Sequence, residues 1–212
     1  MFEDREDAGR NLAKALEKYK DKGVIVLAIP RGGVEVGYEV ARYLNADFSI
    51  IISRKLPFPD NPESGFGAVA EDGSLFLFAG FEALLSKEEV NRIISEQKSE
   101  IIRRITVLRA GKPLPNIREK IVILVDDGIA MGSTMRSAIT LCKNKKAKRI
   151  VVAVPVSGEE AERDFAALVD EVIILEKPHF FQAVAQAYKN WHDVRDKEVI
   201  SILEKWGSKK YE

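Results

Sequence analysis

The chain has 212 residues, of which 46 % are hydrophobic and 31 % charged, so it can bury a sizeable globular core. Its 33 basic and 33 acidic residues cancel, which argues against a protein-wide field for binding nucleic acid. A single cysteine excludes an internal disulfide framework, no apolar run reaches membrane-spanning length, and the charged N-terminus lacks a signal-peptide core. We therefore expect one cytoplasmic domain over residues 1–212, without nucleic-acid or membrane partners.

The first half of the chain predicts strand–turn–helix units. Residues 4–20 have apolar side chains at helical spacing and predict an amphipathic helix. The run 24–30 predicts a buried strand, and a helix is predicted over 34–45. A further strand is predicted over 47–56. Because such units build parallel sheets, residues 30–33 are expected at the carboxyl end of a strand, where open α/β sheets bind ligands.

An insertion follows at about 57–80. Residues 57–66 hold three prolines and predict irregular structure. The alternating apolar residues of 67–78, interrupted by Glu-Asp-Gly, predict a β-hairpin. A serine–glutamate capping box then opens a long helix over 86–109.

The second half alternates strands and helices more regularly. Strands are predicted over 121–125, 149–156 and 171–178, with helices over 135–142 and 158–169 and a helical tail from 198. His192 is placed in a helix after the last strand and treated as structural, since the sequence shows no partner for it. The fold class that follows is α/β: a doubly wound, mostly parallel sheet with helices on both faces and an inserted β-hairpin.

The stretch 121–135, IVILVDDGIAMGSTM, joins an apolar strand, two acids, a small-residue loop and a helix start. Ser133 and Thr134 are expected to cap that helix. Free N–H groups at a helix N-terminus favour a phosphate, so Asp126 and Asp127 beside them suit a ligand with both a phosphate and vicinal hydroxyls, such as a ribose 5-phosphate. The alternative is a strand-to-helix turn whose polar residues only cap.

This stretch resembles the 5-phosphoribosyl 1-pyrophosphate (PRPP) motif of type I phosphoribosyltransferases, and the resemblance to that family covers nearly the whole chain. The run 54–73 is similar to an uncharacterised branch of the family. The resemblance implies that Asp126 and Asp127 hold the ribose hydroxyls. It implies that the 5′-phosphate is held, mostly by backbone N–H groups, on the loop of Gly128, Ile129, Ala130, Met131, Gly132, Ser133 and Thr134. Met131 replaces the usual threonine, so weaker phosphate binding is expected. Ala130 replaces the acid of the 6-oxopurine branch, which leans away from a hypoxanthine or guanine enzyme.

A second match, PRGG at 30–33, resembles the pyrophosphate loop of the same family. It implies phosphate contacts from Arg31, Gly32 and Gly33, and a non-proline cis peptide at Arg31 or Gly32. Arg54 and Lys55 are expected to bring two cations to the same site, the alternative being a solvated strand end.

Two further features would complete such a site. Phe180 and Phe181 offer an aromatic face to a flat base, the alternative being that they fill the core. The insertion lies where the family has its mobile hood, which would exclude water on closing, and the alternative is an arm for dimer contact.

The resemblance implies a pentosyltransferase of nucleotide metabolism, which moves the 5-phosphoribosyl group from PRPP to a nitrogenous base or amine and releases pyrophosphate. Its catalytic residues would be Arg31, Lys55, Asp126 and Asp127. A homodimer and a Mg²⁺ cofactor are also implied, the ion resting on phosphate oxygens and reaching the two aspartates at most through water. The alternative is a non-catalytic PRPP- or nucleotide-binding regulator on the same fold. The sequence does not name the acceptor.

Overall fold

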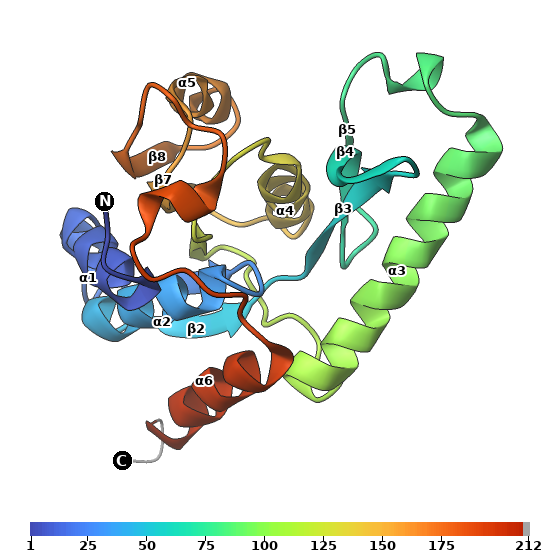
Figure 1. Cartoon of the computed structure of the whole chain (residues 1–212). Helices are drawn as coiled ribbons and strands as arrows, with labels where there is room; N and C mark the ends of the chain where they lie inside the picture. Colours follow the sequence, from blue (N-terminus) through green and yellow to red (C-terminus); the bar gives the residue numbers. More distant parts are fainter. Residues whose placement is uncertain (210–212) are drawn as a thin grey trace.

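The computed structural model describes residues 1–209 and is built around a five-stranded parallel sheet (Figure 1). The strands lie in the order β2-β1-β6-β7-β8. Their bounds are β1 (Ile25–Ala28), β2 (Asp47–Ile50), β6 (Ile121–Val125), β7 (Arg149–Val156) and β8 (Glu171–Glu176). The order shows that the chain first builds to one side of β1 and later, from β6, to the other.

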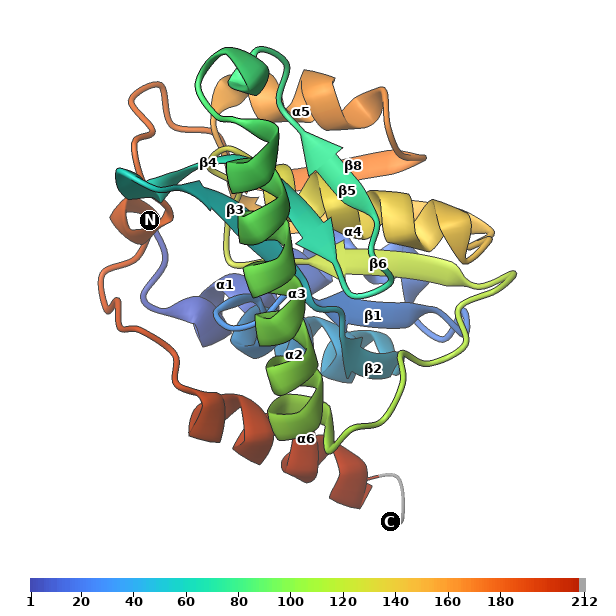
Figure 2. The ribbon, with the colours of Figure 1, turned by 90° about the vertical axis from the view of Figure 1, so that its right-hand side faces the viewer.

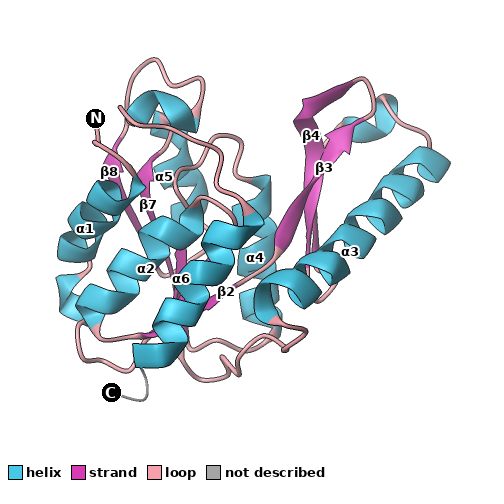
Figure 3. Cartoon of the chain, turned by 60° about the horizontal axis from the view of Figure 1, so that its bottom comes forward, coloured by secondary structure: helices cyan, strands magenta, loops and turns pink. Residues whose placement is uncertain are grey.

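Helices cover both faces of this sheet (Figure 3). One face carries α1 (Arg5–Ala15) and α2 (Gly33–Leu44), with α6 (Asp196–Lys209) packed on α2, and the other carries α4 (Ser133–Asn144) and α5 (Glu159–Ala166). Successive residues of β1 enter opposite cores: Val26 packs towards the α2 side and Leu27 towards the α4 side. Burial on both faces explains the unbroken apolar runs. Among residues 1–209, none of the helices combines the length and the apolar character needed to cross a bilayer.

A smaller antiparallel sheet stands beside the main one, in the order β3-β4-β5. It consists of β3 (Ser53–Phe58), β4 (Asn61–Ala70) and β5 (Leu75–Leu77), and it packs between α4 and the long helix α3 (Lys87–Arg109). Figure 2 shows α3 running along its outer face. Short 3₁₀ helices η1 (Glu17–Tyr19), η2 (Phe81–Ala83) and η3 (Val184–Ala187) complete the elements. The predicted fold class, including the inserted hairpin, is confirmed.

Two predictions about the insertion are wrong in detail. The strand expected over 47–56 is divided between the two sheets, since β2 ends at Ile50 and β3 begins at Ser53. The segment 57–66, expected to be irregular, contributes the end of β3 and the start of β4. Pro57 is tolerated because β3 is an edge strand, where an absent N–H costs little, and because the pairing shifts register there. Pro62 lies at the start of β4, outside the part of that strand that pairs with β5.

The helix expected around His192 is also wrong. After η3 the chain runs without regular structure to α6. Its backbone pairs with the N-terminus instead: the N–H of Lys189 donates to the carbonyl of Phe2, and that of Asn190 to Glu3. These long-range hydrogen bonds override the local helical preference, and they carry the C-terminal segment back over α1.

A buried ion pair joins the turn after β4 to the end of α3. The Arg109 guanidinium donates to Glu71 through two nitrogens and to the carbonyl of Ile50 at 3.1 Å. The side chains of Arg109 and Glu71 are only 6 % and 7 % exposed. Neither charge can therefore reach water if the other is removed.

We expect Arg109→Met to lower the free energy of unfolding by about 3–5 kcal/mol, because Glu71 would be left buried and unpaired. Urea titration followed by circular dichroism measures this. The matched control is Arg92→Met, which breaks an exposed pair with Glu96 and should cost less than about 1 kcal/mol. Equal losses in the two variants would contradict the prediction.

Candidate functional site

The strand order places a topological switch point between β1 and β6. The chain leaves β1 towards β2 on one side, and leaves β6 towards β7 on the other. Loops that follow two such strands diverge, and ligands bind in the gap at the carboxyl ends. Here the two loops are residues 30–33 and 126–134, which are the two segments singled out from the sequence.

The two turns touch. A Cβ atom added to Gly32 would lie 1.8 Å from Oδ2 of Asp127, and one added to Gly33 would lie 2.8 Å from Cα of Asp126. The peptide bond between Pro30 and Arg31 is cis, at one of the two expected positions. Both turns therefore belong to one site on one rim of the sheet.

The loop after the aspartates bends tightly into α4. Gly132 has φ +74°, which a residue with a side chain rarely adopts. Helix α4 begins at Ser133, so neither Ser133 nor Thr134 is its N-cap, contrary to expectation. The N-cap is Gly132, which has no side chain to bond the first-turn N–H groups. These groups remain suited to binding an anion.

A cavity of about 210 Å³ lies in front of this loop. Its lining includes Lys55, Glu63, Asp126, Val184 and the whole loop from Gly128 to Met135. The Lys55 ammonium donates to the carbonyl of Glu63. Burial lowers the pKa of Lys55 from its ordinary value, an effect that the charge of Glu63 opposes. A cation, an acid and an uncapped helix start thus share one small cavity.

Arg5, at the start of α1, contacts Asp127 next to this cavity and was missed by the sequence analysis. Its side chain is 4 % exposed, and its Nε donates to Oδ2 of Asp127 at 2.8 Å. Its Nη1 donates to the carbonyl of His192 at 2.9 Å and to Oε2 of Glu35 at 3.4 Å. The guanidinium carbon lies 3.9 Å from the centre of the Trp191 ring. Arg5 therefore links the aspartates to α2 and to the C-terminal segment.

The surroundings of Asp126 and Asp127 shift the pKa values of both carboxyl groups. Burial, and then repulsion from Asp127, raises the pKa of Asp126 well above its ordinary value. Burial also raises the pKa of Asp127, and Arg5 opposes that rise. The N–H of Asp127 donates to Oδ1 of Asp126 at 2.9 Å, and the Tyr188 hydroxyl donates to the carbonyl of Asp127 at 2.5 Å. The pair is therefore a fixed set of acceptor oxygens suited to neighbouring hydroxyl groups.

Arg31 and Arg54 do not line this cavity. Arg31 is 41 % exposed and lies 3.6 Å from Oδ1 of Asp196. Arg54 donates from Nε to Gln97 of α3 at 3.1 Å. Successive residues of a strand point to opposite faces, so Lys55 faces the cavity while Arg54 faces α3.

The two phenylalanines also lie apart from Lys55 and Asp126. Phe180 is 92 % exposed. Phe181 is partly buried and lines a larger neighbouring cavity of about 550 Å³, which shares Ile129, Ala130 and Met131 with the smaller one. Val184, which was not singled out, lines the smaller cavity together with Asp126.

The residues that the sequence analysis missed had weak local signals. Arg5 lies three residues before Ala8 and seven before Leu12, so it falls on the buried face of α1. A charge on an apolar helix face was the available clue. Tyr188 and Val184 offered none, since their positions depend on the pairing of the C-terminal segment with Phe2.

Comparison with known proteins shows what the chain is similar to. Residues 3–190 match the family model described as the phosphoribosyl transferase domain. The chain is 37 % identical over 207 residues to the Mycobacterium tuberculosis proteins "Putative phosphoribosyl transferase Rv0571c" (strain H37Rv) and "Putative phosphoribosyl transferase MT0597" (strain CDC 1551). These alignments cover 97 % of this chain but 47 % of the relatives, so it spans about half of their length. Among solved structures it is similar to TT1426 from Thermus thermophilus, with a TM-score of 0.81, 36 % identity, and 97 % and 98 % of the two chains covered.

Proposed function

The chain belongs to the phosphoribosyl transferase domain family, and from this premise we propose that it transfers the 5-phosphoribosyl group of PRPP to a nitrogenous base or amine. One observation carries the proposal. Asp126, Lys55 and the uncapped start of α4 line the same small cavity at the switch point of the sheet. That set matches the parts of PRPP: hydroxyls, pyrophosphate and 5′-phosphate.

The ribose would lie on the two aspartates. One oxygen of each carboxylate already accepts a hydrogen bond from the protein, from Arg5 to Asp127 and from the Asp127 N–H to Asp126. This fixes the orientation of both groups, and carboxylate oxygens can accept further bonds from hydroxyls. The 5′-phosphate would take the N–H groups at the start of α4, without the hydroxyl that a threonine would add at Met131.

The reaction breaks the bond between the anomeric carbon and pyrophosphate and forms a bond from that carbon to nitrogen. Positive charge develops on the sugar and negative charge on the leaving group, so catalysis depends on positioning and charge stabilisation. Lys55 would stabilise the pyrophosphate from within the cavity. Arg31 would join it only after turning away from Asp196.

A Mg²⁺ ion fits this arrangement through its substrate. Asp126 lines the cavity and Asp127 follows it in the chain, so both would offer carboxylate oxygens, and Mg²⁺ keeps waters and phosphate oxygens as ligands. Such an ion would neutralise charge on the pyrophosphate. The two aspartates would hold it through water, and Lys55 would complete the positive surroundings of the leaving group.

Pyrophosphate release from PRPP and Mg²⁺, measured across a panel of bases and small amines, tests the proposal. Turnover with any acceptor supports the transferase. Tight PRPP binding without turnover would favour the second candidate, a PRPP- or nucleotide-binding regulator. The observation in favour of that candidate is the half-exposed Met131, which lacks the hydroxyl of the threonine usual at this position. Absence of both binding and turnover would overturn the two together.

Asp127→Asn should weaken PRPP binding by about tenfold to a hundredfold. A hydrogen bond to a charged group contributes about 1.5–3 kcal/mol, and the amide also loses its pairing with Arg5. Isothermal titration calorimetry gives the affinity directly. Asp164→Asn is the matched control, because that acid pairs with Arg136 outside the cavity. Unchanged PRPP affinity in Asp127→Asn would remove the ribose assignment.

A further inference from the structure

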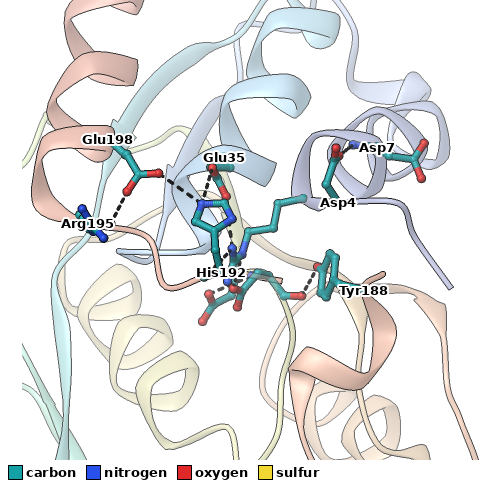
Figure 4. Close-up of polar contacts among 10 residues, drawn as sticks. Asp4, Asp7, Glu35, Tyr188, His192, Arg195 and Glu198 are labelled. Atoms are coloured by element: carbon teal, nitrogen blue, oxygen red, sulfur yellow. Dashed lines mark hydrogen bonds and ion pairs between the residues drawn. The ribbon is translucent and has the colours of Figure 1, made fainter. Parts of the chain in front are cut away.

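Three potential metal ligands lie close together outside the small cavity that we propose for PRPP (Figure 4). They are Glu35 of α2, Glu198 of α6 and His192 of the segment that precedes α6. Nε2 of His192 lies 3.2 Å from Oε1 of Glu198 and 3.7 Å from Oε1 of Glu35. All three ligand atoms lie within 4.8 Å of one another. We propose that this His–Glu–Glu cluster, which we call the triad, binds a divalent transition metal, with zinc as its ion.

The carboxylates are already oriented for this purpose. Oε2 of Glu198 accepts a hydrogen bond from the backbone N–H of Arg195 at 2.8 Å. Oε2 of Glu35 accepts one from Arg5 at 3.4 Å. In each glutamate the other oxygen, Oε1, is the one turned towards His192, as Figure 4 shows. Donors that hold the outer oxygen of a ligand are the usual second layer of a metal site.

The position of the histidine is fixed as well. Its carbonyl accepts from Arg5 at 2.9 Å, and the neighbouring Trp191 ring lies against the same guanidinium. The imidazole itself is 53 % exposed, so solvent reaches the triad. An entry path and a position for a water ligand are therefore present.

The spacing suits zinc. Bonds of 2.0–2.2 Å in a tetrahedron place neighbouring ligand atoms about 3.3–3.6 Å apart, close to the two distances from His192. Imidazole with two carboxylates favours zinc over Mg²⁺ or Ca²⁺, which prefer oxygen ligands alone. The positive charge of Arg5 faces Glu35 and opposes a cation, but the same guanidinium is also paired with Asp127. Two carboxylates and a neutral imidazole leave enough negative charge for the ion.

A bound ion would join three parts of the molecule. Glu35 belongs to α2, Glu198 to α6, and His192 to the segment that places Tyr188 and Trp191 against Arg5. The triad is thus two contacts from Asp127, through Glu35 and Arg5. The metal would act as a clamp on the C-terminal segment, not as a participant in transfer.

The test is zinc binding by tag-free protein that has been treated with chelator and dialysed. Calorimetry should give one Zn²⁺ per chain, and Co²⁺ should give the visible absorption of a site with nitrogen and oxygen ligands. His192→Ala and Glu198→Gln should each weaken zinc binding at least tenfold. His179→Ala is the matched control: that histidine is 86 % exposed and pairs with Glu159 alone among the described acids. It should leave zinc binding unchanged.

The melting temperature, Tm, distinguishes a triad that binds metal from one that only forms ion pairs. Added Zn²⁺ should raise the Tm of the wild-type chain and of His179→Ala but not that of His192→Ala, with native circular dichroism confirming that each variant folds. Lys55→Met should keep its zinc binding, which distinguishes the triad from the small cavity that Lys55 lines. Zinc binding that survives His192→Ala, or is lost in Lys55→Met, would overturn the proposal. So would a wild-type chain that binds no zinc, whose triad would then be a contact among three side chains without a metal.

Discussion

Replacing Gly32 with alanine should lower kcat/KM for PRPP by at least about 100-fold while the protein still folds. The backbone of Gly32 has φ −58° and ψ −36°, which any residue adopts, so glycine is required here for space and not for conformation. The added Cβ would lie 1.8 Å from Oδ2 of Asp127, and 2.9 Å from Nε of Arg5. Either the aspartate leaves Arg5 or the turn moves by more than an ångström. Misplacement on that scale costs about 100-fold in rate.

Steady-state kinetics with PRPP, or calorimetry if no acceptor is found, measures the effect. The control is Gly207→Ala in α6, where a Cβ would meet nothing within 4 Å. It should leave PRPP kinetics unchanged and stabilise the helix by up to about 1 kcal/mol. If Gly32→Ala binds and turns over PRPP normally, the contact between the two turns has no functional role.

The parallel sheet was predictable because its inner strands are buried on both faces. That burial imposes continuous apolar runs at 24–30, 121–125 and 149–156, which are visible without any alignment. The β3–β4 hairpin was not predictable in the same way. Its three prolines signal irregular structure, and they are compatible with strands only at an edge and around register shifts, which depend on tertiary pairing.

In the candidate site, too, residues that are contiguous in sequence were predictable, and those that depend on tertiary pairing were not. Asp126, Asp127 and the following loop are contiguous, so one segment of sequence carries the strand end, the acids and the helix start. Lys55 was separable from Arg54 by strand alternation alone, since neighbours in a strand face opposite ways. The assembly around Arg5 was not predictable. It requires the C-terminal segment to return to the N-terminus, which the isolated bridge between Phe2 and Tyr188 records.

Arg5→Met should lower the free energy of unfolding by about 3–5 kcal/mol at pH 8, the usual loss when one partner of a buried pair is removed. The methionine keeps much of the volume against Trp191 but leaves Asp127 without its 2.8 Å partner. PRPP affinity should fall as well, since the orientation of Asp127 depends on that bond. Arg5→Lys keeps the charge but not the fork of donors, so we expect an intermediate loss. Arg10→Met, on the exposed side of α1, should change stability by less than about 0.5 kcal/mol.

The pH dependence identifies the cause. The folded-state pKa values of Asp126 and Asp127 lie above the ordinary carboxyl value. Between the ordinary pKa and the folded-state pKa of each group, the folded protein therefore binds more protons than the unfolded chain. Stability is therefore highest below the ordinary value and falls as pH rises through the folded-state pKa. Arg5 lowers both pKa values, so removing it widens the window, and the loss in Arg5→Met should be larger at pH 8 than at pH 5.

Asp126→Asn in the Arg5→Met background should recover part of the loss at pH 8, because one of the unpaired charges is gone. Urea titrations of the wild type, Arg5→Met and the double variant at both pH values measure this. A loss that is equal at pH 5 and pH 8 would show that Arg5 stabilises the fold by packing and not as the counter-charge of the aspartates.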